Sequence, residues 1–252
     1  PWALPSEVVS AGQLTVVYPV PYVLYQRTDA DGGPMQIRGT YGPAGEVGAV
    51  EARFNGGPWQ VVDAQPRNGS FSGTIAARVG QGTLEVRAGG PSTPAAIVEH
   101  VSVGDLFVIA GQSNADGRGD KHVLLDPAHR YVGVKFRHNA WSRGDDPSAN
   151  DGDYGSPWPM VLNDLIPDQQ VPLGFIAAAV GSTVVKEWRK GGRLYERMFK
   201  MVTEATGGSR RIKAVLYYQG ENDITHYHSL SALGDYNRYK RDLTAAVSDF
   251  QR

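Results

Sequence analysis

The stretch from Leu106 to Asn114, which reads LFVIAGQSN, constrains the fold of this chain more than any other. Its apolar part, which ends at Ala110, continues without a polar break into the turn GQSN. Such a run predicts a strand buried on both faces of a parallel sheet. Ligands bind outside the carboxyl ends of these strands, so Ser113 stands where a nucleophile would meet a substrate. Serine is also common at helix N-caps. From the turn alone, a Ser113 that only caps the next helix is as well supported as a nucleophile.

From residue 101 onward, apolar runs alternate with segments of helical spacing. The expected strands are Leu106–Ala110, Val132–Phe136, Leu173–Val180 and Ile212–Gln219. The expected helices carry apolar residues from Trp158 to Ile166, from Leu194 to Ala205 and from Tyr236 to Phe250. Strands that alternate with helices predict a parallel sheet covered on both faces. The long segment from Arg137 to Ser156 is rich in Gly, Asp, Asn and Pro, and we expect a substrate-facing loop there.

The first hundred residues follow a different pattern. Apolar Val50, Ala52 and Phe54 alternate with polar residues, and the segment around Val86 repeats this alternation. A period of two between glycine-rich turns predicts strands with one wet face. We therefore predict a small β-sandwich, immunoglobulin-like or jelly-roll-like, over residues 1–100 and an α/β domain over residues 101–252. A packing or spacer role is favoured over carbohydrate binding for the β domain, because a fold alone does not supply a function.

Composition excludes several classes of partner. The 252 residues carry 25 basic and 26 acidic side chains without a basic run, so neither nucleic acid nor an anionic membrane surface is expected as a partner. No apolar run approaches the roughly 20 residues that a membrane span needs. The absence of cysteine removes disulfides and thiolate metal sites. A chain that begins at Pro1 in place of methionine is expected of a processed protein that is secreted or periplasmic.

Three blocks in order resemble one known family. The GQSN turn resembles the nucleophile block of the SGNH hydrolases, in particular their sialate O-acetylesterase-like branch of carbohydrate esterases. Two later stretches match the same branch: Ala179–Thr183 with Trp188 downstream, and Tyr218–Asp223. Upstream, Tyr25–Arg27 followed by Ile37–Thr40 resembles the β segment that often precedes this domain. The resemblance implies a three-layer α/β/α domain and a serine esterase, without a cofactor, that removes O-acetyl groups from carbohydrates such as acetylated xylan or sialic acid.

The resemblance also implies the parts of the active site. Ser113 would be the nucleophile, and the backbone N–H of Gly181 would donate to the oxyanion, although Gly181 is also compatible with a simple turn glycine. The third donor is Asn222 by likeness to the wider superfamily or Gln219 by likeness to the carbohydrate-esterase branch, and Gln219 is slightly preferred. Glu221 would hold the turn by accepting backbone hydrogen bonds.

Residues that flank the blocks are candidate substrate contacts. Gln112 and Asn114 lie on either side of the nucleophile, and Trp188 follows the glycine block. The indoles of Trp141, Trp158 and Trp188 offer flat surfaces for sugar rings, but each is individually better explained as core, because aromatic side chains usually bury large areas.

The chain departs from the family at its end. SGNH enzymes take their catalytic histidine from a late loop, often with an aspartate three residues before it, and no such block precedes Arg252. We expect a C-terminal segment of the same gene product to complete the site. The less favoured alternative is that Asp223 and His226, which spell D-x-x-H, supply the aspartate and the catalytic histidine. Glu221, Asp223, His226 and His228 also form a cluster of carboxylates and imidazoles, but their spacing matches no metal motif and no metal is predicted.

Two other functions fit parts of the sequence. A glycan-binding module that kept the fold but lost the base would explain the missing histidine block. Within enzymes, a general lipase or thioesterase is the second choice, made less attractive by the shortage of long apolar stretches near Ser113.

Overall fold

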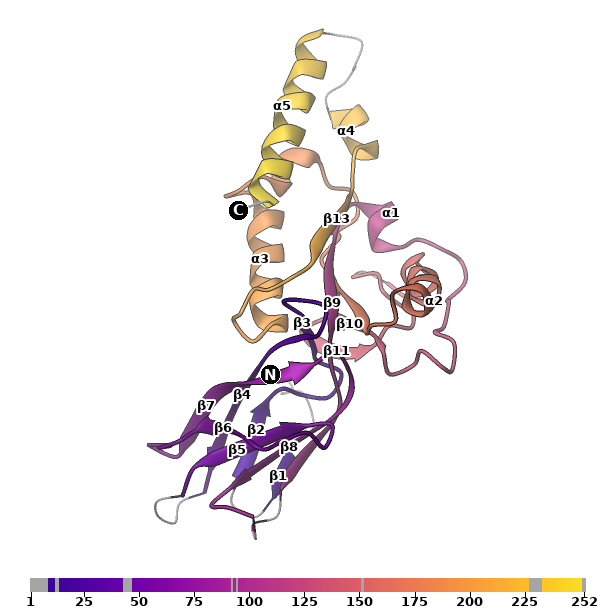
Figure 1. Ribbon diagram of the computed structural model, residues 1–252. Helices are drawn as coiled ribbons and strands as arrows, with labels where there is room; N and C mark the ends of the chain where they lie inside the picture. The colour runs from indigo at the N-terminus through magenta and orange to yellow at the C-terminus, as the bar shows by residue number, and fades with distance from the viewer. Residues whose placement is uncertain are drawn as a thin grey trace.

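The computed structural model describes residues 9–11, 14–42, 47–91, 93, 95–150, 152–226 and 233–250. The chain has a mixed α/β fold with a large mixed sheet (Figure 1). The early strands are β1 (Val9–Ala11), β2 (Leu14–Tyr18), β3 (Leu24–Gln26), β4 (Gly32–Tyr41), β5 (Val50–Phe54), β6 (Gln60–Asp63), β7 (Ser70–Arg78) and β8 (Gly80–Ala88). They are followed by β9 (Ala96–Gly111), β10 (Gly133–Arg137), β11 (Ala140–Arg143), β12 (Leu173–Ala177) and β13 (Ala214–Tyr218).

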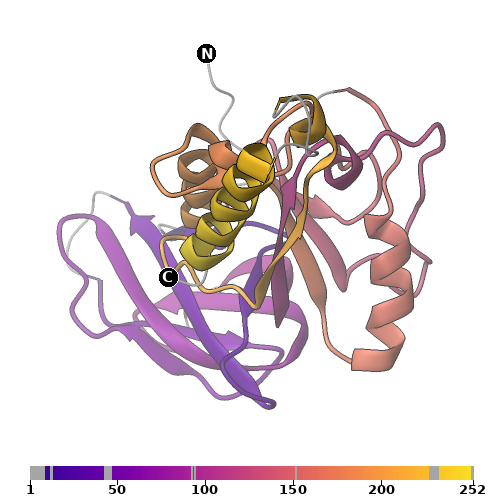
Figure 2. The ribbon, with the colours of Figure 1, turned by 90° about the horizontal axis from the view of Figure 1, so that it is seen from above.

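The described helices confirm the three that were expected and include shorter ones that were not. They are α1 (Ser113–Asp116), α2 (Trp158–Gln169), α3 (Arg193–Ala205), α4 (Glu221–His226) and α5 (Leu233–Phe250), with a 3₁₀ turn over Val185–Trp188. Seen from above, α2 covers one face of the parallel strands, and α3 and α5 cover the other (Figure 2). No helix within the described ranges is both long enough and apolar enough to cross a membrane.

The 16-residue strand β9 joins the two parts of the fold. Its first half pairs antiparallel with β8, and its second half pairs in parallel with β12 on one edge and β13 on the other. The predicted strand Leu106–Ala110 is therefore the carboxyl half of a longer one. Because β9 crosses residue 100, the residues on both sides of the predicted domain boundary share one strand, and the division into two domains stays a prediction.

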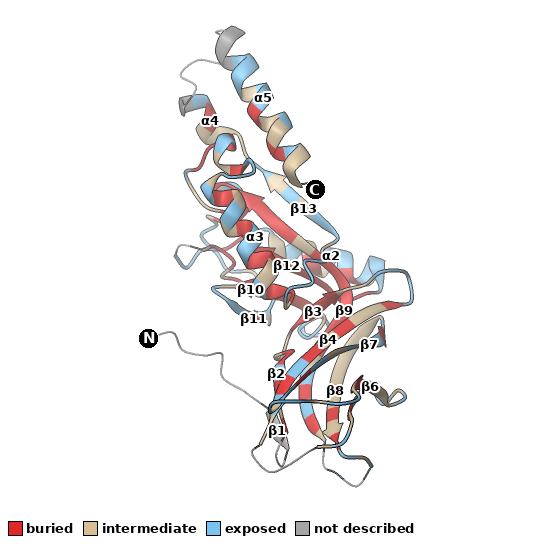
Figure 3. Cartoon of the chain, turned by 90° about the vertical axis from the view of Figure 1, so that its left-hand side faces the viewer, coloured by how far each residue is buried: buried red, intermediate tan, exposed pale blue. Residues whose placement is uncertain are grey.

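The second half of β9 is buried on both faces, as its apolar run predicts (Figure 3). Successive side chains of a strand point to opposite faces of the sheet. Ile109 belongs to an apolar cluster with Leu162 of α2, whereas Val108 belongs to another cluster with Met198 of α3. These two clusters clamp β9 between helices and so hold the strand end that carries Ser113.

The early strands form two sheets. A four-stranded sheet has the order β1-β2-β4-β7, and β8, β5 and β6 extend the nine-stranded sheet beyond β9. The predicted alternation is confirmed in β5, where Val50, Ala52 and Phe54 are buried and the residues between them are partly exposed. The assignment of this region to an immunoglobulin-like or jelly-roll-like sandwich stays a prediction.

The segment predicted as one long loop, Arg137–Ser156, contains a strand. β10 and β11 form a hairpin whose turn residues, His138 and Asn139, have φ angles of 49° and 61°. Two central residues with positive φ are typical of the tight turn that matches the twist of hairpin strands. The rest of the segment, from Gly144, runs as irregular chain toward α2.

A buried carboxylate fastens β3 to β9. The guanidinium of Arg27 donates two hydrogen bonds of 2.8 Å to Asp105, which is only 4% exposed. Gln26 donates to the same carboxylate at 3.2 Å and accepts from the backbone of Leu106 at 2.8 Å. Burial alone would raise the pKa of Asp105, but the bonds from Arg27 and Gln26 outweigh it and hold that pKa below its ordinary value.

The substitution Asp105→Asn tests this junction. It leaves the Arg27 guanidinium beside a neutral amide, so the free energy of unfolding should fall by about 3–5 kcal/mol. Glu85→Gln is the matched control, because Glu85 binds Arg53 in the same two-bonded way but nearer to solvent, and its loss should be about 1 kcal/mol or less. Urea unfolding of both variants measures the difference, and equal losses would contradict the assigned role of Asp105.

Lys135 in β10 supplies a pH-dependent prediction. The side chain is 6% exposed, and its ammonium donates to the backbone carbonyl of Asp145. Burial first, and the charge of Arg137 second, lower the pKa of Lys135 from 10.5 to about 8. Between these values the unfolded chain holds a proton that the folded chain lacks, so the stability contributed by this group rises with pH.

We therefore expect the free energy of unfolding of the wild type to gain relative to Lys135→Met as the pH rises from about 8 to about 9.5, by up to roughly 1.4 kcal/mol per pH unit. Urea unfolding of both proteins across this range checks the prediction. Parallel curves would show that Lys135 keeps its proton in the folded chain.

Candidate functional site

The three predicted blocks meet at the carboxyl edge of the parallel strands (Figure 1). Ser113 follows β9, Gly181 lies beyond the end of β12, and Gln219 follows β13. Two backbone hydrogen bonds tie the strand ends together: Val180 donates to Gly111 at 2.9 Å, and Gln112 donates to Tyr218 at 3.1 Å. Residues about seventy and a hundred positions from Ser113 in the chain thus become its neighbours.

Ser113 is the first residue of the short helix α1 and is partly exposed. The N-cap position belongs to Gln112, so the alternative that Ser113 merely caps the helix is wrong. The sharp turn before it depends on Gly111, whose φ is +126° and whose added Cβ would lie 1.8 Å from the carbonyl oxygen of Tyr218. The close approach of β13 therefore dictates glycine at this position.

Gly181 lies beside Ser113. A Cβ added to Gly181 would lie 3.8 Å from the Cβ of Ser113 and 2.5 Å from the Nη2 atom of Arg118. The space around Gly181 is thus limited by the nucleophile candidate on one side and a guanidinium on the other. Sequence reasoning missed Arg118, which also places its guanidinium 5.1 Å from the ring centre of Tyr154.

Gln219 and Asp223 bind the third block to the glycine block. The amide nitrogen of Gln219 donates to the Thr183 carbonyl at 2.5 Å and to the carboxylate of Asp223 at 3.0 Å. Asp223 is fully buried and also accepts from the backbone of Val185 at 2.8 Å. Both N–H groups of Gln219 therefore point at protein acceptors, whereas Asn222 is partly exposed at the start of α4. The oxyanion role of either residue stays a prediction.

Glu221 connects the third block to the nucleophile block. The side-chain amide of Asn114 donates to its carboxylate at 2.5 Å. Partial burial raises the pKa of Glu221, but hydrogen bonds from its own backbone N–H and from Asn114 prevail and lower that pKa. Glu221 is therefore held as a carboxylate. Through this bond Asn114 links the nucleophile block to the third block. Gln112, on the other side of Ser113, is buried.

The tryptophans mostly lie in the core, which agrees with the alternative stated for them. Trp188 is completely buried, so it offers no surface to a sugar in this structure and its predicted substrate contact is not supported. Trp141 is also buried and donates to the carbonyl of Ala205 at 3.1 Å. Trp158 is partly buried and donates to the carbonyl of Ala115, just after the nucleophile, at 2.7 Å.

The alternative aspartate–histidine pair, Asp223 and His226, lies partly outside the described residues. Asp223 faces Gln219 and Val185, while the side chain of His226 and the whole of His228 are not described. Among the side chains that the structure does describe, no group of three His, Asp or Glu residues is arranged to hold a metal ion.

A polar cluster lies beneath the site, and sequence reasoning missed it. Asp116, three residues after Ser113, is 2% exposed and accepts hydrogen bonds from Arg118 at 2.9 Å and from the backbone of Asn150 at 2.8 Å. Arg197 of α3 completes the cluster through a 3.1 Å bond to the Asn150 side chain. The sequence did contain one signal, which is the aspartate three residues after the candidate nucleophile. A carboxylate that is buried at such a position is almost always paired, so Asp116 indicated partners.

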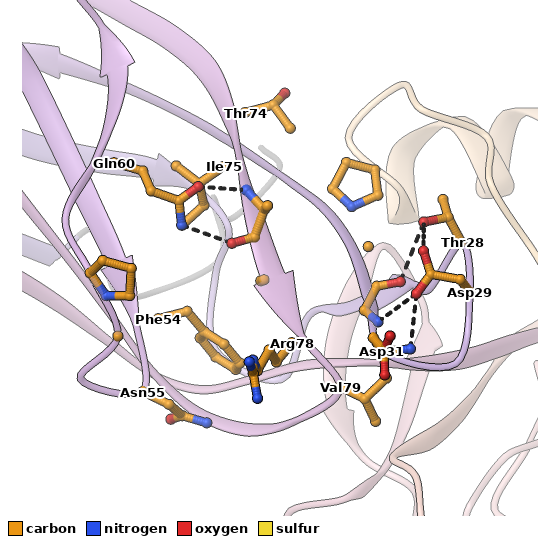
Figure 4. A pocket seen from close by; sticks show the side chains of 17 residues that line it. Thr28, Asp29, Asp31, Phe54, Asn55, Gln60, Thr74, Ile75, Arg78 and Val79 are labelled. Carbon is orange, nitrogen blue, oxygen red and sulfur yellow. Dashed lines mark hydrogen bonds between the residues drawn. The ribbon is translucent and has the colours of Figure 1, made fainter.

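A cavity of about 910 Å³ lies elsewhere, between the turns of the early strands (Figure 4). Two of its polar side chains are bound to neighbouring backbone: Gln60 of β6 exchanges hydrogen bonds of 2.8 and 3.0 Å with Ala76 of β7, and Asp29 accepts from the backbone of Asp31 at 2.9 Å. Because it holds none of the three blocks, the edge that carries Ser113 is the better candidate for chemistry.

Comparison with known proteins gives a consistent picture. Residues 103–252 match the SASA family, described as carbohydrate esterase, sialic acid-specific acetylesterase. The chain is similar to a probable carbohydrate esterase of Arabidopsis thaliana, At4g34215, with 33% identity over 153 residues. That match covers 52% of this chain and 58% of the relative, so the chain spans less than two thirds of the relative's length.

Two solved structures are also similar. The Arabidopsis thaliana protein AT4G34215 shares 26% identity, with 57% of this chain and 70% of that chain covered and a TM-score of 0.45. XAC1771, a carbohydrate acetylesterase from Xanthomonas citri, shares 17% identity, with 90% of this chain and 58% of that chain covered and a TM-score of 0.53. The second likeness is one of fold alone.

Alanine at the two glycines of the site should lower the stability by very different amounts. Gly181→Ala meets only the flexible end of Arg118, so the free energy of unfolding should fall by about 1 kcal/mol or less while the guanidinium moves away from Ser113. Gly111→Ala meets a backbone carbonyl at a positive φ and should cost about 3 kcal/mol or more. Urea unfolding compares the two variants, and a crystal structure of Gly181→Ala locates Arg118. An unmoved guanidinium in that structure would refute the contact.

Proposed function

The chain belongs to the SASA family of carbohydrate esterases, and from that premise we propose that it removes O-acetyl groups from carbohydrates by nucleophilic attack of Ser113. The observation that carries the proposal is the juxtaposition of Ser113 and Gly181, whose added Cβ would lie 3.8 Å from that of the serine. A serine nucleophile beside a glycine whose backbone N–H can donate is a pair that acyl transfer uses.

In the proposed reaction, the Oγ atom of Ser113 bonds to the acetyl carbonyl carbon while a base takes the hydroxyl proton. The backbone N–H groups of Ser113 and Gly181 stabilise the oxyanion that forms, and each such donor is typically worth about 2.7–4 kcal/mol. The bond to the sugar oxygen then breaks, and that oxygen receives the proton. Water attacks the acetyl-serine in the same way, releasing acetate and restoring the hydroxyl.

Either of two side chains supplies the third donor. Gln219 is slightly preferred by likeness to the family, but it would have to exchange its bond to Thr183 or Asp223 for one to the oxyanion. Asn222 is partly exposed and needs no such exchange with those partners. Glu221 and Asn114 hold α1 against α4 and so keep this donor block beside Ser113.

We propose that the histidine base comes from a further segment of the same gene product, which adds a strand to β13. Among the described strands, β13 pairs only with β9, and its residues Leu216 and Tyr218 are 36% and 55% exposed (Figure 3). A parallel strand on that edge would end next to Gly220, so the loop after it would open toward Ser113. The substrate would be an acetylated carbohydrate such as acetylated xylan or sialic acid.

The decisive experiment measures acetate release from acetylated xylan and acetylated sialic acid by the complete gene product and by this chain alone. Ser113→Ala in the complete protein should lower kcat on the order of 10⁴-fold or more. Ser142→Ala, at a serine of β11, is the matched control and should leave kcat unchanged. The chain alone should be inactive and regain activity when the downstream segment is added.

Other results would support other functions. Glycan binding by the complete protein without acetate release would identify a non-catalytic module on this fold. Full activity of the 252-residue chain would place the base within it and make His226 the leading candidate.

A further inference from the structure

The side chain of Asn150 lies under the segment that leads from β12 to Gly181. Its amide nitrogen is 2.8 Å from the carbonyl oxygens of both Ala177 and Ala179, and 3.2 Å from the carboxylate of Asp116. An amide has two N–H groups, and the two shorter contacts use them. The carbonyl between these two, that of Ala178, accepts from Arg197 at 2.9 Å.

The orientation of this amide is determined by its neighbours. The Oδ1 atom of Asn150 accepts from the Nη2 atom of Arg197 at 3.1 Å, and a guanidinium can only donate. A flipped amide would set its NH₂ group against that guanidinium and its oxygen against the carbonyls of Ala177 and Ala179. Asparagine in this one orientation therefore satisfies every neighbour that contacts it.

Asp116 connects Asn150 to the nucleophile helix. The carboxylate accepts from the backbone of Asn150 at 2.8 Å and from Arg118 at 2.9 Å, and it lies 3.2 Å from the side-chain nitrogen of Asn150. It belongs to α1, whose first residue is Ser113. One side chain thus contacts the helix of the nucleophile and the segment that precedes the oxyanion glycine.

The segment after β12 is held from both sides. On the side of β9, the backbone N–H groups of Ala178 and Val180 donate to Ile109 and Gly111, each at 2.9 Å. On the opposite side, its carbonyls are bound by Asn150 and Arg197. Without the hydrogen bonds from Asn150 and Arg197, only the bonds to β9 would fix the position of the segment that leads to Gly181.

We propose that Asn150 is a positioning residue of the esterase site, which sets the place of the Gly181 N–H relative to Ser113 by holding the carbonyls of Ala177 and Ala179. The inference rests on the proposed function. Acyl transfer needs donors that point at the oxyanion. A displacement of such a donor by about 1 Å lowers the rate on the order of 10²-fold, so the residue that holds the donor in place affects the rate. Asn150 itself need not touch the substrate.

Asn150→Asp tests the proposal in the complete gene product, because the variant has nearly the same shape. It replaces the donor with an oxygen that faces two carbonyls and the carboxylate of Asp116. We expect kcat for acetate release to fall about 100-fold while KM changes less than about threefold, because the variant displaces groups that act on the oxyanion and not groups that bind the sugar. Rates are referred to the folded fraction from an unfolding curve.

The matched control is Asn163→Asp. The Asn163 amide also donates to a backbone carbonyl, that of Leu124, at 3.1 Å, but its partners lie only in residues 124–129. Its kcat should equal that of the wild type. Arg197→Lys serves as a second variant in case Asn150→Asp does not fold: it keeps the charge but loses the fork that binds Ala178 and Asn150 together, and kcat should fall about tenfold with KM unchanged.

The outcomes separate the two proposals. A wild type without Ser113-dependent acetate release would overturn the proposed function, and this inference with it. An active wild type whose kcat survives Asn150→Asp, or survives Arg197→Lys where the first variant is unfolded, would overturn this inference alone. A fall in stability with kcat per folded molecule unchanged would show that the Asn150 cluster is purely structural.

Discussion

The parallel pairing of β9 with β12 and β13 is the interaction on which the rest of the structure depends. In its register, Ala177 lies opposite Ile109 and Tyr218 lies opposite Gly111, so three strand ends reach the same edge. A slip by one residue would turn the side chains of β9 to the wrong faces and expose its apolar residues. The helices on both faces make this slip costly, because each packs on alternate residues of the strand. The burial of apolar side chains in the sheet therefore fixes the relative positions of the three strand ends that carry the site.

Polar contacts then fix what the sheet leaves open. Beyond the strand ends the chain has no ladder partners, and buried carbonyls there need other donors. Asn150 and Arg197 supply them after β12, and Gln219 supplies one for Thr183. Asn114 binds the carboxylate of Glu221 at the start of α4. A buried polar network of this kind stabilises the fold only when every polar group in it has a hydrogen-bond partner. An unpaired buried group destabilises the fold by more than one hydrogen bond stabilises it.

The sequence predicted those features that depend on local patterns. The apolar runs located β9, β10, β12 and β13, and helical spacing located α2, α3 and α5, because burial leaves a period in the chain. The three blocks predicted which segments lie together. What failed depended on partners distant in sequence. Nothing local distinguishes a serine at an N-cap from one a residue later, and the capping alternative for Ser113 proved wrong for that reason.

Other misses share this cause. Lys135 interrupts an apolar strand, yet it is buried because Asp145 provides a carbonyl for its ammonium. Asn150 lies in a segment predicted only as a loop, and the polar neighbours of its side chain come from β12 and the segment after it, from α1 and from α3, so no spacing in the sequence connects them. Conversely, its place after the glycine block suggested Trp188 as a surface for a sugar ring, whereas Trp188 is completely buried and packs against the ring of Tyr217.

The two halves of the proposed site are held to different degrees. Ser113 and Gly181 follow strands in the middle of the parallel sheet and are joined through Asp116 and Asn150, so their mutual position is determined by buried contacts. The third block follows β13, whose residues are all exposed or partly exposed. Hydrogen bonds nevertheless join the third block to both other blocks, from Gln219 to the Thr183 carbonyl and from Asn114 to Glu221. Ser113 and Gly181 are thus fixed against each other by buried contacts, whereas the third block follows a strand with an exposed edge. The proposed base would arrive at that same edge, so a strand added to β13 would also cover the exposed side of the third block.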